Sequence, residues 1–77
     1  MIENLKVQLP VNKELHHHAL YNNKDNTHLG LIDMNKDKEL IDELMQGKEI
    51  SYCKVEMENG RIIKVLDHIT EKEFLEG

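Results

Sequence analysis

The chain has 77 residues, a formal net charge of −5, 39% hydrophobic residues and only 4% aromatic residues. Because a chain of this length can bury only one small core, residues 1–77 are expected to form a single domain. Arg61 is the only arginine, and arginine is the preferred side chain for phosphate and base edges, so nucleic-acid binding is not expected. Neither an apolar stretch long enough to span a membrane nor a signal-peptide pattern is evident, which predicts a cytoplasmic protein without membrane association.

The first predicted element is a strand over residues 5–9, where apolar and polar residues alternate and Pro10 follows. Residues 12–22 are ambiguous, because Asn12 could also cap a helix reaching Tyr21. We favour a hairpin around the turn-forming residues 22–26. If Tyr21 lies opposite Thr27, one face of this hairpin is mostly apolar and should form part of the core: Leu15, His17, Ala19, Tyr21, Leu29 and Leu31. The other face then carries His16, His18, Leu20, His28, Gly30 and Ile32.

A helix is predicted next, with Asp33 or Asn35 as its cap and Gly47 at its end. Its buried stripe would contain Leu40, Ile41, Leu44 and Met45, which follow helical spacing. The residues from Asp33 onward also imitate the start of a calcium loop, but Lys38 and Leu44 stand where such a loop needs glycine and glutamate.

A second hairpin is predicted over residues 50–69, turning near Gly60. A two-residue turn would pair Met57 with Ile62, whereas a three-residue loop would place Met57 and Ile63 on one face. We favour the three-residue loop, because it separates apolar from charged residues better. The lone Cys53 then faces the core as a small apolar side chain, although a contact with His68 across the hairpin is conceivable. Thr70 and Glu73 have the spacing of a capping box, which predicts a short helical turn carrying Phe74 against the domain.

These elements predict an α+β fold in which an antiparallel sheet of about five strands packs on one central helix. The sheet would consist of two hairpins and the N-terminal strand, and a short helical turn would end the chain. The second hairpin also has apolar residues on the face turned away from the core. Either a second layer of the same chain or another copy of the chain must cover that face, and because so short a chain has little core of its own, we favour self-association. The predicted self-association residues are Ile50, Tyr52, Ile62 and Leu66.

The first functional hypothesis is a non-enzymatic, acidic protein-binding or regulatory module that acts as a homo-oligomer. The alternative is a small-molecule or metal-binding protein that uses a histidine cluster at or near a subunit boundary. Neutral imidazoles could bind a divalent transition metal there, and no other cofactor is expected. The candidate metal or ligand residues are His16, His18, His28, Tyr21 and Asp33. No catalytic motif is recognised, so an enzyme is not the favoured interpretation.

Overall fold

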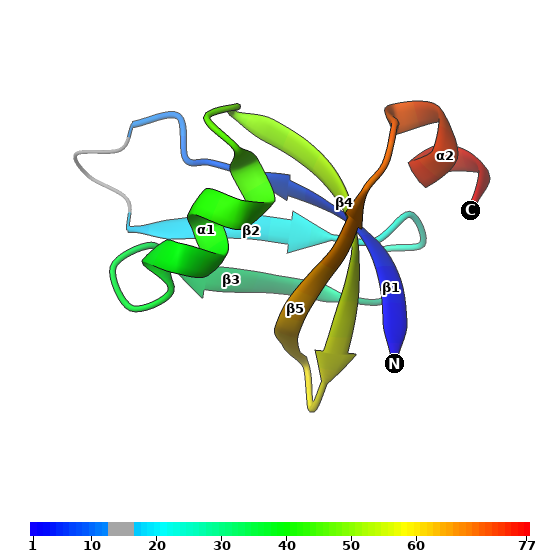
Figure 1. The fold of residues 1–77 in the computed structure, drawn as a ribbon, viewed down its shortest axis with the longest axis horizontal. Helices are drawn as coiled ribbons and strands as arrows, with labels where there is room; N and C mark the ends of the chain where they lie inside the picture. Colours follow the sequence, from blue (N-terminus) through cyan, green and yellow to red (C-terminus); the bar gives the residue numbers. More distant parts are fainter. Residues whose placement is uncertain (13–16) are drawn as a thin grey trace.

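A computed structural model describes residues 1–12 and 17–77 of the chain. The fold is mixed α+β and contains more sheet than helix, with five antiparallel strands and two helices among the described residues (Figure 1). In chain order the elements are β1 (Ile2–Gln8), β2 (His18–Asn22), β3 (Leu29–Asp33), α1 (Lys38–Met45), β4 (Ile50–Glu58), β5 (Arg61–His68) and α2 (Glu71–Glu76).

The strands form one curled sheet in the order β3-β2-β1-β4-β5. Strand β1 lies at the centre, because it pairs with β2 on one side and with β4 on the other. The two hairpins predicted from the sequence, β2–β3 and β4–β5, therefore flank it, and β3 and β5 are the edge strands. The N-terminal strand begins earlier than predicted, at Ile2, and Leu9 follows it.

The core lies inside the curl of the sheet. Leu5 and Val7 of β1 are fully buried there together with Cys53, Val55 and Met57 of β4. Their alternate positions confirm the two-residue period expected of half-buried strands. Helix α1 adds Ile41, Leu44 and Met45 to the same cluster, as its apolar stripe predicts.

Both ends of α1 differ in detail from the prediction. Asp37 occupies the cap position without a side-chain cap hydrogen bond, whereas Asp33 accepts hydrogen bonds from the backbone N–H groups of Asn35 and Lys36 in the preceding turn. The helix ends through two left-handed residues, Gln46 and Gly47, so the predicted glycine stop is preceded by one further residue. Helix α2 is capped as expected, because Thr70 and Glu73 form a complete capping box.

The predicted three-residue loop of the second hairpin was wrong. Asn59 and Gly60, both with positive φ, form a two-residue turn, and Met57 pairs with Ile62. Such a turn suits the right-handed twist of the adjoining strands. A register shift then follows on β5, so Val55 pairs with Val65, while Ile63 is half exposed at 53% instead of buried. The β-bulge returns Val65 to the face of Val55, as the three-residue loop predicted, but in a register that neither alternative gives.

Candidate functional site

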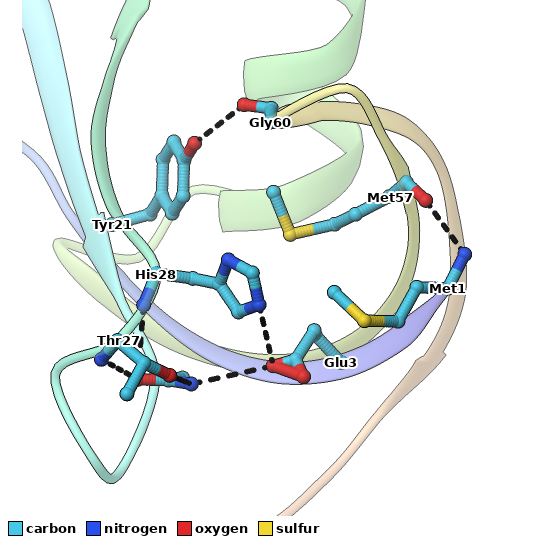
Figure 2. Close-up of polar contacts among 8 residues, drawn as sticks. Met1, Glu3, Tyr21, Thr27, His28, Met57 and Gly60 are labelled. Carbon is cyan, nitrogen blue, oxygen red and sulfur yellow. Dashed lines mark hydrogen bonds and ion pairs between the residues drawn. The ribbon is translucent and has the colours of Figure 1, made fainter.

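The register of the β2–β3 hairpin is set by Asn23, which is buried although it is polar. Its Oδ1 accepts hydrogen bonds from the backbone N–H groups of Thr27 (2.8 Å) and His28 (3.3 Å). Its Nδ2 donates to Thr27 Oγ1 (2.7 Å) and to Glu3 Oε2 (3.3 Å). These bonds hold a wide turn between the strands (Figure 2), so that Tyr21 lies opposite Gly30. The predicted pairing of Tyr21 with Thr27 was therefore wrong.

This register reverses the two faces of β3, because side chains alternate along a strand. Ile32 is buried at 5% exposure, although the sequence predicted it for the histidine face. Leu29 and Leu31 were predicted for the core, yet they are 61% and 64% exposed. Leu20, which pairs with Leu31, is 47% exposed. We call Leu20, Leu29 and Leu31 the outer leucine surface, since they share the convex side of the sheet.

The same register separates the histidines. His18 is exposed on β2 opposite Asp33, on the outer side of the sheet. His28 points to the inner side, where its Nε2 lies 3.8 Å from Glu3 Oε2 (Figure 2). His16 lies outside the described residues. Within residues 1–12 and 17–77, no group of three or more histidine, cysteine, aspartate or glutamate side chains could hold a metal ion.

Tyr21 and Asp33, the other candidate ligand residues, have structural contacts. The buried Tyr21 ring lies against Gly30, and its hydroxyl donates to the Gly60 carbonyl oxygen at 2.9 Å (Figure 2). That bond ties the first hairpin to the turn of the second. The backbone N–H groups of Lys36 and Asn35 hold the pKa of Asp33 below its usual value. Tyr21 also lines the recess between the first hairpin and α1, whose volume of about 80 Å³ is small against the several hundred Å³ of a typical ligand pocket.

The predicted self-association residues do not form one surface. Ile50 and Leu66 are about 40% exposed, at 41% and 40%. The Tyr52 ring instead packs on Phe74 of α2, with ring centroids 5.2 Å apart. Ile62 turns toward the core because of the two-residue turn. Ile50 stands in the same row across the sheet as Leu20 of the outer leucine surface, with Gln8 of β1 between them.

Cys53 and His68 do meet across the second hairpin, with Sγ 3.4 Å from Nδ1. The thiol is nevertheless fully buried, and it also contacts Ser51 Oγ and the Leu44 carbonyl oxygen at 3.5 Å. Burial raises the pKa of Cys53, and the Ser51 hydrogen bond opposes this only in part. Because the reactive form is the thiolate, this environment favours a packing role over nucleophilic chemistry.

The outer edge of β3 carries backbone hydrogen-bonding groups that do not bond to β2. Asn23 and His28 are joined by a backbone hydrogen bond, as are Met34 and His17. Hydrogen-bonded positions alternate along an antiparallel pair, so Gly30 and Ile32 bond to β2, while the peptide groups of Leu29 and Leu31 face the opposite way. Within the described part of the chain, β3 has no second strand beside it.

The two edges of the sheet differ in how they are protected. Strand β5 has two register shifts and carries Arg61, Lys64 and Asp67, and such bulges and charges hinder the addition of a further strand. Strand β3 pairs with β2 without a shift, and its sequence Leu-Gly-Leu-Ile-Asp contains one charge, at its end. The β3 edge and the outer leucine surface were not predicted from the sequence. A hairpin register that pairs Tyr21 with Gly30 would have predicted both from the sequence, because an aromatic side chain often covers a glycine on the neighbouring strand.

Comparisons of the chain with protein-family models, curated proteins and solved structures find no match. No helix among residues 1–12 and 17–77 is long and apolar enough to cross a membrane. The geometry of the described residues is therefore the basis for any functional proposal.

Proposed function

We propose that the chain is a non-enzymatic protein-binding module that acts as a homo-oligomer through β3 and the outer leucine surface. The observation that carries this proposal is the coincidence of two features on one strand. Leu29 and Leu31 present exposed side chains, and their peptide groups face an open sheet edge. Adding a strand at an open edge supplies main-chain hydrogen bonds, and the adjoining side chains supply the apolar contact.

The affinity of such an interface is expected to be moderate. Fully burying a leucine side chain contributes about 1.5–3 kcal/mol, and Leu29 and Leu31 each leave nearly two thirds of their surface to be buried. Association costs about 4–15 kcal/mol in lost freedom of motion. A few leucines on each side and a short ladder of hydrogen bonds offset this cost only modestly. We therefore expect dissociation constants in the range of about micromolar to millimolar.

Sedimentation velocity from low micromolar to near-millimolar concentration tests the proposal. The wild-type mass should rise with concentration above the 9.0 kDa of one chain. The double variant Leu29→Lys/Leu31→Lys should stay monomeric and folded, because both side chains are exposed. Ile63→Lys is the matched control, since Ile63 is similarly exposed at 53% but lies on the other edge strand, and it should associate like the wild type.

A wild-type chain that remains monomeric over the whole range would refute the homo-oligomer. Association that Ile63→Lys abolishes and the leucine variant retains would move the interface to β5.

A further inference from the structure

We propose that two copies of this chain join their β3 strands antiparallel about a two-fold axis that passes through Gly30. The inference rests on the proposed function and specifies its partner and register. It uses two observations: the direction of the free peptide groups on β3, and the identity of the side chains that would meet.

The free groups of β3 are self-complementary. An antiparallel pair related by a two-fold axis places equivalent residues symmetrically about the axis. With the axis through Gly30, Leu29 lies opposite Leu31 of the partner subunit, and Leu31 lies opposite Leu29 of the partner subunit. Each of these residues directs its N–H and C=O away from β2. Each pair can therefore exchange two hydrogen bonds, as the hydrogen-bonded pairs of an antiparallel ladder do.

The side chains favour this register over the one with its axis through Leu31. An axis through Leu31 would also align free peptide groups, but it would set Leu29 opposite Asp33 of the partner subunit. The Asp33 carboxylate would then lose water beside a leucine, which costs free energy. The backbone carbonyl oxygen of Asp33 already accepts the Asp37 N–H at 2.9 Å, which weakens the ladder at Asp33 equally in both registers. The axis through Gly30 instead places leucine opposite leucine at both positions, and Asp33 then lies near the exposed, polar Thr27 of the partner subunit, which precedes β3.

The chosen register also makes the outer leucine surface continuous between subunits. Leu20 lies beside Leu31 on β2, so each row runs from Leu20 through Leu31 to Leu29 of the partner subunit. Neighbouring side chains on one face of a sheet stabilise it by direct contact. On the inner face the axis passes between two glycines, each covered by its own Tyr21 ring, so no side chain of β3 itself stands between the two strands at the axis.

Arg61 is one of the residues beside the path of the entering strand, together with Asp37, Leu40 and Ile62. Arg61 lines the small recess that also involves Leu31 and Ile32. It is exposed, so it can turn into solvent at little cost when the second strand binds. The variant Arg61→Ala should consequently associate at least as tightly as the wild type.

Disulfide trapping tests the register. Residues in a hydrogen-bonded antiparallel pair have Cα atoms about 5.5 Å apart, within the range that a disulfide bridges, whereas diagonal neighbours lie about 7–8 Å apart. An equimolar mixture of Leu29→Cys and Leu31→Cys chains should give a covalent dimer under mild oxidation, which reductant reverses. Each variant alone should not, and the buried Cys53 of the wild type should give none.

The outcomes separate the register from the proposed function. Covalent dimers of Leu31→Cys alone would overturn the Gly30 axis and place the axis at Leu31, while association through β3 would stand. Association by sedimentation without any trapped dimer would show that the leucines meet in another geometry and would overturn the strand pairing. A monomeric wild type would refute both proposals.

Discussion

The packing of Tyr21 on Gly30 in the first hairpin can be tested quantitatively by substitution. A methyl group added at Gly30 would overlap the far end of the Tyr21 ring. The ring is 6% exposed and its hydroxyl is bonded to Gly60, so it cannot swing aside freely. Overpacking a core costs about 1–3 kcal/mol, and losing the Tyr21 hydrogen bond adds about 1 kcal/mol. Gly30→Ala should therefore lower the free energy of unfolding by about 2–4 kcal/mol.

A double-mutant cycle isolates this contact. In the background Tyr21→Leu the ring is absent, so Gly30→Ala should be nearly neutral or slightly stabilising, because alanine loses less conformational entropy than glycine. Tyr21→Phe measures the hydroxyl alone and should cost about 1 kcal/mol. Urea unfolding followed by circular dichroism, with all variants at one low concentration, gives the four free energies of the cycle and that of Tyr21→Phe. Effects of Gly30→Ala that are the same in both backgrounds, within about 0.5 kcal/mol, would refute the predicted overlap.

Three further predictions concern other contacts. The buried Cys53 thiol should react with a thiol reagent only after unfolding. Because its pKa is raised from 9.0 in the folded state, the wild type should lose stability above pH 9 relative to Cys53→Ala. Equal slopes of unfolding free energy against pH for the two proteins would contradict this. The pKa of Asp33 is lowered from 3.8, so the carboxylate stabilises the fold above that pH, and this stabilisation is lost as the pH falls through the folded pKa. Asp33→Asn keeps the acceptor oxygen but does not titrate, so its melting temperature should fall less steeply in acid. Thr70→Ala should cost about 1 kcal/mol by removing the cap of α2, whereas Thr70→Ser should retain most of the stability in the same melting experiment.

The elements that depend on local signals were predictable. Alternation in β1, the apolar stripe of α1 and the capping box at Thr70 each reflect contacts within a few residues. The predictions for these three elements were confirmed, apart from shifts at their ends. Cys53 was also placed correctly in the core, because its neighbours along β4 alternate regularly.

The registers of both hairpins depended on contacts that the sequence does not display. Asn23 fixes the first hairpin partly through Glu3, twenty residues away, and a bulge after Ile62 changes the register within the second. A shift by an odd number of residues exchanges the faces of a strand. Leu29 and Leu31 were consequently predicted for the core, and the histidines were predicted to converge. The outer leucine surface follows from the observed pairing of Tyr21 with Gly30, which the predicted register did not contain.

The bulges of β5 bear on how far assembly could proceed. An open sheet with two receptive edges can grow without limit, as fibrils do. Here the shifts at Lys54/Val55 and Glu56/Met57 distort the β5 edge of the sheet, so the addition of another strand to β5 is hindered. In a symmetric dimer the β3 edges of both copies would be paired with each other. The same irregularities that complicate the C-terminal hairpin would thus stop polymerisation at two chains.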